Sequence, residues 1–239
     1  GCEDLSDLRK ALFHAEKKTG YVIDMILFIL GKAERQCGSV TRGIELLERA
    51  AKMDNIGAAS GLAFAYLYVG DITSAIKAKD RVVLQSQARL MERFTQSAQR
   101  TTWLRFWPAE IESAILGAQG KYQEEEKLLR ICIAEDPYVI DTAANAILIK
   151  RARLAGNLSN EGRLTEAEVE AREVIQESIG LAGKAGEITA GAVGALAYIM
   201  VKQGRHEEAE KLARYRIKIV ESTGLFADTR YNALAYISL

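Results

Sequence analysis

The feature that most constrains this chain is a repeat of 42 residues. The stretch that begins at Gly162, GRLTEAEVEAREVI, and the stretch that begins at Gly204, GRHEEAEKLARYRI, are identical at eight of 14 positions. The stretch that begins at Gly120, GKYQEEEKLLRICI, matches the Gly204 stretch at seven of 14. Fainter copies begin at Gly38 and Gly70. A period of this length predicts a chain built from repeated helical or mixed units that stack on one another.

Each copy indicates a helix, a glycine turn and a second helix. Apolar residues recur at helical spacing on both sides of the glycine, which ends a helix readily because it adopts the left-handed backbone conformation without steric strain. Small residues recur at one place in the first helix and one in the second, where they let two helix axes approach. These are Ala63, Ala155 and Ala197, and Ala75, Ala167 and Ala209. With only 2 Pro in 239 residues, an all-α chain is expected.

The residues then carry a family resemblance. The set Leu62, Ala63, Tyr66, Gly70 and Ala75 resembles the tetratricopeptide repeat, or TPR. The longer period of 42 residues is similar to the repeats of kinesin light chain and of bacterial TPR proteins that carry a CHAT peptidase domain. The resemblance implies an α-solenoid of stacked antiparallel helical hairpins, forming one superhelical domain over residues 1–239 with about five repeats.

Some intervals depart from the regular repeat. Gly38 and Gly70 are 32 residues apart and Gly70 and Gly120 are 50 apart, which predicts an irregular or lengthened region at residues 84–107. In the Gly120 copy, Glu125 replaces the second small residue, and we expect that repeat to pack differently. Residues 233–237, ALAYI, duplicate residues 195–199 and predict a truncated sixth repeat. No polar-faced cap is visible at either end, which predicts a piece of a longer protein or an end that another chain covers.

The sequence contains no recognisable catalytic or cofactor motif. It has neither GxxxxGK[ST] nor GxGxxG after a strand, and its two histidines stand apart from Cys2, Cys37 and Cys132 without CxxC or HExxH spacing. Cys37 and Cys132 are interpreted as small buried residues. The acidic run at residues 124–126 is interpreted as a solvated helix start. We therefore expect no enzyme activity, no cofactor and no metal site in this chain.

A partner-binding surface is the remaining candidate for function. The TPR resemblance places the first helix of each hairpin on the concave side. Aromatic and basic residues at these inward positions, together with two tryptophans of the lengthened region, could anchor a peptide or protein. The candidates are Arg35, Phe64, Tyr68, Tyr198, Lys202, Trp103 and Trp107. The alternative is that these side chains fill contacts between repeats and the core, with Pro108 marking an ordinary helix start.

The balance of basic and acidic residues argues against nucleic acid as a partner. With 32 basic and 32 acidic residues, the chain lacks the positive excess that a nucleic-acid-binding protein requires. Residues 77–105 hold seven basic residues against two acidic. This basic stretch either lies against the acidic residues 106–141 or receives an acidic peptide.

These observations predict a non-catalytic scaffold that binds a peptide, a protein or another part of its own polypeptide. The alternative implied by the resemblance is the regulatory TPR region of a larger enzyme, such as a CHAT-type cysteine peptidase lying outside this chain. The apolar run at residues 21–30 is too short to span a membrane. A cytoplasmic location is expected; the alternative is an exported lipoprotein anchored through Cys2, because the chain opens with Gly-Cys.

Overall fold

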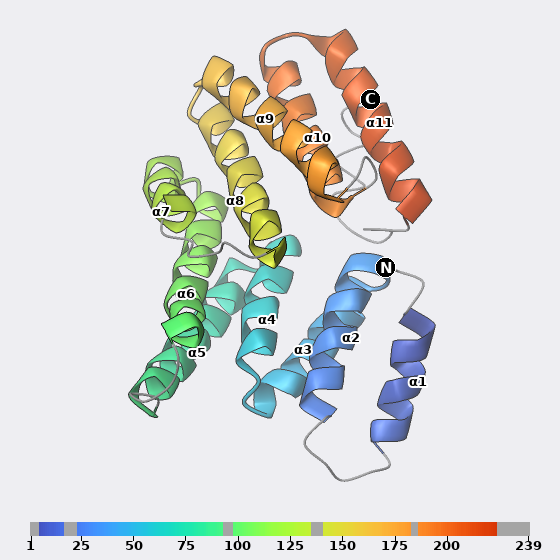
Figure 1. Ribbon diagram of the computed structural model, residues 1–239, viewed down its shortest axis with the longest axis vertical. Coiled ribbons are helices and arrows are strands. Elements are labelled where there is room, and N and C mark those ends of the chain that lie inside the picture. Colours follow the sequence, from blue (N-terminus) through green and yellow to red (C-terminus); the bar gives the residue numbers. More distant parts are fainter. Residues whose placement is uncertain (1–4, 17–22, 93–97, 135–140, 183–185, 224–239) are drawn as a thin grey trace. The chain divides into compact units, whose positions relative to one another are not determined.

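The computed structural model describes residues 5–16, 23–92, 98–134, 141–182 and 186–223, and gives the backbone alone at residues 91–92, 98–106, 141–145, 182 and 187. Every regular element in these ranges is an α-helix (Figure 1), as the all-α expectation requires. The helices are α1 (Leu5–Ala15), α2 (Ile23–Cys37), α3 (Val40–Lys52), α4 (Ile56–Tyr68), α5 (Ile72–Glu92), α6 (Ala98–Ala118), α7 (Tyr122–Ala134), α8 (Asp141–Asn160), α9 (Leu164–Ala182), α10 (Glu187–Lys202) and α11 (His206–Thr223).

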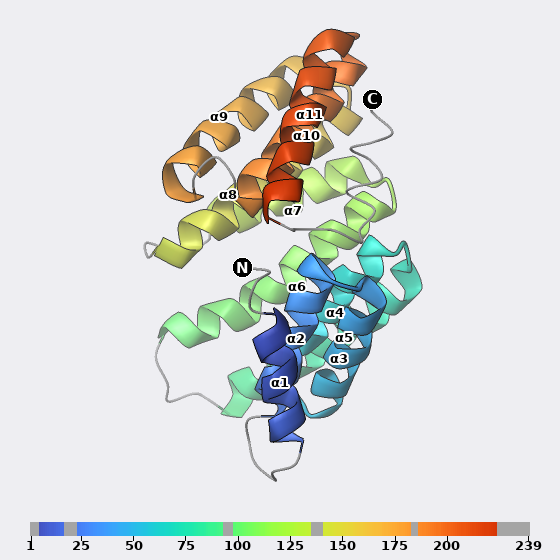
Figure 2. The same cartoon turned by 90° about the vertical axis from the view of Figure 1, so that its right-hand side faces the viewer.

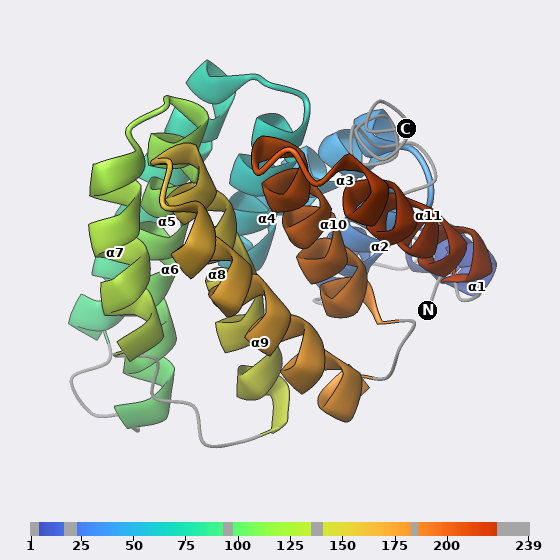
Figure 3. The same ribbon diagram turned by 90° about the horizontal axis from the view of Figure 1, so that it is seen from above.

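The helices fall into two compact units, one with α1–α6 and one with α7–α11, and each is described by itself. In the first, α2 with α3 and α4 with α5 form hairpins, and α6 contacts both α4 and α5. In the second, α8 with α9 and α10 with α11 form hairpins, α7 contacts α8, and α10 contacts both α8 and α9. Figure 3 shows α9, α10 and α11 following one another in this second unit. The single domain expected over residues 1–239 stays a prediction.

Four of the five predicted glycine turns form as their sequence predicts, and the turn predicted at Gly38 does not. Gly70, Gly120, Gly162 and Gly204 have φ angles of 80°, 76°, 83° and 76°. At Gly204, the amide donates to the carbonyl of Val201 at 3.0 Å, and the next amide, that of Arg205, donates to the carbonyl of Met200 at 2.9 Å. This is a Schellman motif, in which two otherwise unsatisfied carbonyls at the helix end receive partners. The same pair of bonds closes α4 at Gly70 and α8 at Gly162.

The small residues lie where helices meet. Ala63, Ala75, Ala155, Ala167 and Ala209 are 0–1% exposed, and they line the cores together with large aliphatic side chains. The core of the first unit includes Leu27, Leu30, Leu47, Leu62 and Ile111, and that of the second includes Leu129, Leu158, Leu196, Ile199 and Met200. Each hairpin thus buries its apolar faces against its own second helix and against neighbouring hairpins, as stacked repeats require.

A helix outside the repeat pattern, α1, packs beside α2 (Figure 2). Its Leu5, Leu8 and Leu12 face the core, while most of its remaining residues are exposed. Arg9 donates two hydrogen bonds, of 2.7 and 3.0 Å, to the fully buried carboxylate of Glu34. Burial raises the pKa of Glu34, but the bonds from Arg9 outweigh it and hold that pKa below its ordinary value. A polar-faced cap that the repeat pattern does not predict therefore covers α2.

The lengthened interval consists of two long helices. Both α5 and α6 have 21 residues, whereas α3 and α4 have 13 each. Pro108 lies inside α6 and does not begin it, so its interpretation as a helix start is wrong. A proline within a helix removes one backbone donor, and that loss is tolerated here between two long helical segments.

Candidate partner-binding faces

In the first unit, predicted site residues of α2 and α4 contact each other. The guanidinium carbon of Arg35 lies 4.9 Å from the centre of the Tyr68 ring. The ammonium of Lys32 lies 5.5 Å from the centre of the Phe28 ring. Two cations are therefore placed over aromatic rings on this face, an arrangement worth about 0.5–1 kcal/mol for each exposed pair.

The two helices approach closely at their beginnings. A Cβ atom at Gly57 would lie 3.0 Å from Cζ of Phe28, so the glycine lets the Phe28 ring pack onto α4. Asn55 caps α4 by accepting a hydrogen bond from the amide of Ala58 at 2.9 Å and donates another to Asp24 at 2.8 Å. These contacts fix the register of α2 against α4.

Lys32 and Arg35 carry positive charge that no acidic side chain pairs with in the described part of the chain. Among the described residues, neither has a carboxylate within ion-pair distance, and Nε of Arg35 is buried without a hydrogen-bond partner. Lys32 is exposed and Arg35 is half-buried. This face therefore carries positive charge that the described part of the chain does not neutralise.

In the second unit, the predicted residues Tyr198 and Lys202 also form one cluster. The ammonium of Lys202 lies 4.8 Å from the centre of the Tyr198 ring. It donates to the carbonyl of Ser159 at 3.1 Å and to the side-chain oxygen of Asn160 at 2.9 Å. Because these groups end α8, the cation also meets the negative end of that helix. The Tyr198 side chain contacts Lys202 and donates to Asn160 at 3.4 Å, while the residue stays 48% exposed.

The contacts of the two units occur at equivalent repeat positions. Tyr68 and Lys202 each stand two residues before the glycine that ends their hairpin's first helix. Their partners Arg35 and Ser159 each stand three residues before the corresponding glycine of the preceding copy. First helices of successive copies thus meet through the same two repeat positions. We call the surfaces that carry these side chains the inner faces: one is formed by α2 and α4, the other by α8 and α10.

The other predicted residues are placed differently. Phe64 and Trp107 are partly buried and pack against the core of the first unit. Trp103 lies in α6, but its side chain is outside the described residues. The structure therefore brings together Arg35 with Tyr68 and Tyr198 with Lys202, and it places Phe64 and Trp107 where the core interpretation puts them. A role in binding stays a prediction for all seven.

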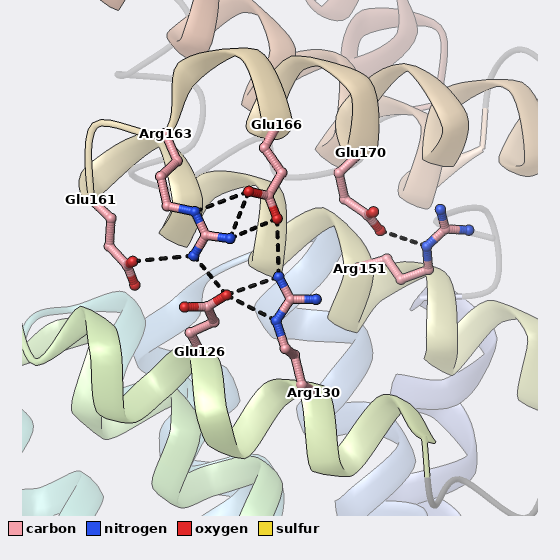
Figure 4. A network of polar contacts seen from close by, with 7 residues as sticks. All are labelled: Glu126, Arg130, Arg151, Glu161, Arg163, Glu166 and Glu170. Atoms are coloured by element: carbon pink, nitrogen blue, oxygen red, sulfur yellow. Dashed lines mark hydrogen bonds and ion pairs between the residues drawn. The ribbon is translucent and has the colours of Figure 1, made fainter.

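The second helices carry a network of ion pairs that sequence analysis did not identify (Figure 4). Arg163, in the turn before α9, pairs with Glu126 of α7 at 2.8 Å and with Glu166 of α9 at 2.6 Å, and Arg130 joins the same two carboxylates. Burial raises the pKa of Glu126, but hydrogen bonds from Arg130 and Arg163 outweigh it, so that this pKa is lowered. The sequence signal that could have found this network is the basic residue directly after Gly120, Gly162 and Gly204 and the glutamate six residues after each of these three glycines.

One copy later, Arg205 and Glu168 repeat this contact at 2.8 Å, over the same 37-residue separation. Glu168 also accepts from Gln203 at 3.0 Å and pairs with Arg172. Although burial raises the pKa of Glu168, these bonds lower it to about 2. These ion pairs join the second helix of one copy to the turn of the next copy. Their role is structural.

The acidic run at residues 124–126 is not simply a solvated helix start, as its sequence suggested. Glu125 is 7% exposed, pairs with Arg153 of α8 at 2.9 Å and accepts from Asn157 at 2.9 Å. A buried polar contact thus replaces the small residue of the other copies, and the different packing expected there is present.

Much of the basic stretch is bound within the first unit. Lys79 pairs with Glu112 at 2.8 Å, which joins the basic stretch to the acidic one. Arg81 donates to the carbonyl of Ala51, and Arg89 donates to that of Asp54 at 2.6 Å. These three side chains anchor α5 to its neighbours, which favours the structural interpretation of the stretch over an acidic-peptide site.

The described residues hold no group of three or more His, Cys, Asp or Glu side chains placed to bind a metal ion. Within the same ranges, no helix combines the length and apolarity that a membrane crossing demands. Cys132 is buried as expected, whereas Cys37 is half-buried and disulfide-bonded, so its interpretation as a buried small residue is wrong. Cys2 lies outside the described residues.

Comparisons with solved structures decide the type of fold. The chain superposes on nearly identical TPR-like repeats of a putative kinesin light chain from Podosopora anserina with a TM-score of 0.52 at 18% identity, covering 86% of this chain and 99% of that one. The chain has a TPR-like repeat fold. BtubC (BKLC) from P. vanneervenii gives a TM-score of 0.50 at 16% identity, and the match covers 79% of this chain and 74% of that one.

No model of a known protein family matches the sequence, and no curated protein matches it. At identities of 16–18% the TPR-like structures establish the fold alone. They agree with the helical hairpins and glycine turns seen in both units, and they say nothing about which surface of this TPR-like chain binds a partner.

Proposed function

We propose that this TPR-like chain is a non-catalytic scaffold that binds a peptide or protein partner on its inner faces. The observation that carries the proposal is a contact between first helices of successive copies that recurs at equivalent repeat positions: Arg35 with Tyr68, and Ser159 with Lys202. The exposed ring of Tyr198 lies against Lys202. In each unit, such side chains on neighbouring first helices offer a surface for another chain.

The energetics of Tyr198 favour a binding role. A tyrosine offers a large apolar ring with a polar tip, and binding hot spots are enriched in this residue. Lys202 and Asn160 already restrict the ring. A partner that covers it therefore gains apolar burial while losing little additional side-chain entropy, which usually opposes association by about 0.5–1.5 kcal/mol for each immobilised side chain.

The charge of the first inner face indicates the chemistry of the partner segment. Because Lys32 and Arg35 have no ion-pair partner among the described residues, a carboxylate that approaches them meets uncompensated positive charge. A segment that carries aspartate or glutamate beside apolar residues fits this face. The alternative of a regulatory region for a CHAT-type peptidase stays a prediction of the sequence resemblance.

Affinity capture from cells that carry the native gene tests the proposal. The test protein is the double variant Tyr68→Ala with Tyr198→Ala. The matched control is Leu84→Ala with Val169→Ala, which removes two side chains that are 66% and 54% exposed on the second helices α5 and α9. Circular dichroism and thermal melting establish that each variant is folded.

The proposal predicts that the inner-face variant captures its partner at least tenfold less than wild type, since each hot-spot aromatic contributes about 2 kcal/mol. The control should capture it as wild type does. Equal capture by a folded inner-face variant would reject Tyr68 and Tyr198 as anchors.

A further inference from the structure

The exposed side of α2 in the first inner face is apolar at its start and basic at its end. Met25, Ile29 and Lys32 follow one another at spacings of four and three residues, which places them on one side of the helix. Met25 and Ile29 are 49% and 43% exposed, whereas Leu27 and Leu30 of the same helix are buried in the core. A surface of this kind favours a chain that brings apolar area and carboxylates together.

One side of α9 carries the opposite arrangement. Glu170, Glu173, Glu177 and Leu181 follow one another at spacings of three, four and four residues, so the glutamates come first and the leucine last. Leu181 is 57% exposed, and the side chains of Glu173 and Glu177 are 56% and 52% exposed. Val169 stands about a quarter turn away, outside this stripe.

The carboxylates on this side of α9 outnumber the described cations that bind them. Arg151 of α8 pairs with Glu170, Glu173 and Glu177 at 2.5, 2.8 and 2.6 Å, and Figure 4 shows its contact with Glu170. Among the described residues, no other basic side chain pairs with these three. One positive charge against three negative charges leaves a net charge of −2 on the stripe.

One antiparallel register matches the two stripes along their length. Each stripe passes between apolar and charged side chains within seven or eight residues, which is about 11 Å of helix. Because the order along α9 is the reverse of that along α2, oppositely directed helices bring like with like in apolarity and unlike with unlike in charge. The resulting neighbours are Leu181 between Met25 and Ile29, Glu177 with Lys32, and Glu173 with Arg35. In the parallel direction, matching the apolar ends would carry the glutamates away from the cations.

We propose that the first inner face of one copy of this chain binds residues 173–181 of α9 from a second copy. The inference rests on the proposed function, because it names the occupant of the first inner face; the second inner face takes no part in it. The two surfaces that meet are different, so the contact is heterologous and each chain offers one surface of each kind.

Sedimentation velocity on the purified full chain, with no other protein present, tests the proposal. The test variants are Lys32→Glu, Glu177→Lys and the two changes combined in one chain. The control is Lys218→Glu, which makes the same change of charge at an exposed position of α11. Circular dichroism establishes that each variant is folded.

The proposal predicts that wild type sediments faster as its concentration rises and that added salt opposes this association. Lys32→Glu and Glu177→Lys should each weaken the association at least tenfold, because each places like charges opposite one another. The combined variant should regain it, since unlike charges face one another again, and Lys218→Glu should leave it unchanged.

A wild type that stays monomeric at every concentration overturns the proposal. So does equal behaviour of Lys32→Glu and the control, and so does a combined variant that associates no better than either single variant. Because no other protein is present, rejection of Tyr68 and Tyr198 as anchors in the capture experiment would leave these results unchanged. A monomeric wild type would likewise leave the capture result unchanged.

Discussion

At the scale of single residues, glycines serve two physical purposes in this chain. Gly204 ends α10 with a φ of 76° and has open space around it, so its role is conformational. Gly43 has ordinary φ, and a Cβ there would lie 2.9 Å from the backbone of Arg35, so its role is steric. Sequence alone shows the first purpose through the turn pattern, but it cannot show the second, which depends on where α2 crosses α3.

Replacing the turn glycine should destabilise the protein by a defined amount. We expect Gly204→Ala to lower the free energy of unfolding by about 1–2 kcal/mol, because an L residue in the left-handed region is strained. The control is Gly191→Ala in the same helix, where nothing lies within 4 Å and φ is ordinary. It should stabilise by up to about 1 kcal/mol. Denaturant unfolding measures both, and equal effects would contradict this account of the turn.

Gly38 shows where the turn pattern misleads. It begins the first copy in the sequence, yet it is not among the described glycines with positive φ. Its amide donates to the carbonyl of Glu34, as in a continuing helix, and a Cβ there would lie 2.3 Å from the carboxylate of Glu34. Arg9 of α1 binds the same carboxylate. A contact with a helix outside the repeat could not be predicted from the repeat.

At the scale of elements, the crossing of α2 and α3 depends on two small residues. A Cβ at Gly43 would also lie 2.9 Å from the carbonyl oxygen of Gly31. We therefore expect Gly43→Ala to push the two helices apart and to destabilise the protein by about 1–3 kcal/mol. Gly156→Ala, which replaces a helical glycine without neighbours within 4 Å, is the matched control and should not destabilise. Thermal melting distinguishes them, and an unaffected Gly43→Ala variant would refute the close crossing.

The ion pairs between copies should make stability depend on pH. The pKa of Glu168 is lowered from 4.5 to about 2, so the folded state binds its proton less readily than the unfolded state does. Its stabilising contribution is therefore complete above pH 4.5 and is lost as the pH falls towards 2. At pH 7 we expect Glu168→Gln to cost about 1 kcal/mol of unfolding free energy, a difference that shrinks across this acid range.

The matched control for this prediction is Glu210→Gln. Glu210 has the same repeat position, but its described ion pair is an exposed one within α11. Its replacement should change the free energy of unfolding by only a few tenths of a kcal/mol, both at pH 7 and in the acid range. If the two variants lost equal stability in urea titrations at pH 7, the pairs that join successive copies would not be the source of the effect.

The helices themselves were largely predictable from sequence, but the side-chain contacts between them were not. The 42-residue identity and the glycines located the hairpins α8–α9 and α10–α11. The burial of Glu125 against Arg153, and the use of Lys79 to join α5 to α6, depend on side chains far apart in the sequence. The acidic run at residues 124–126 therefore suggested a solvated surface where the structure has contacts between helices.

At the scale of the whole molecule, the TPR-like fold repeats the same kind of helical hairpin in both units. The described chemistry is distributed over equivalent positions of successive hairpins, which is typical of repeat proteins that bind along a surface. Five of the candidate residues were found because they occupy inward positions of the first helices, and the two tryptophans because they lie in the lengthened region. Sequence could not distinguish an exposed Tyr198 from a core-packed Phe64, because both follow the same Leu-Ala pair.

The central claim is that partners bind to the inner faces and not to the second helices. A photo-crosslinking amino acid in place of Tyr198 or Tyr68, compared with one in place of the exposed Val169 or Leu84, tests this most directly. The account predicts a crosslinked partner from Tyr198 and Tyr68, identified by mass spectrometry, and none from Val169 or Leu84. Crosslinks to the same partner from Val169 or Leu84 alone would contradict it.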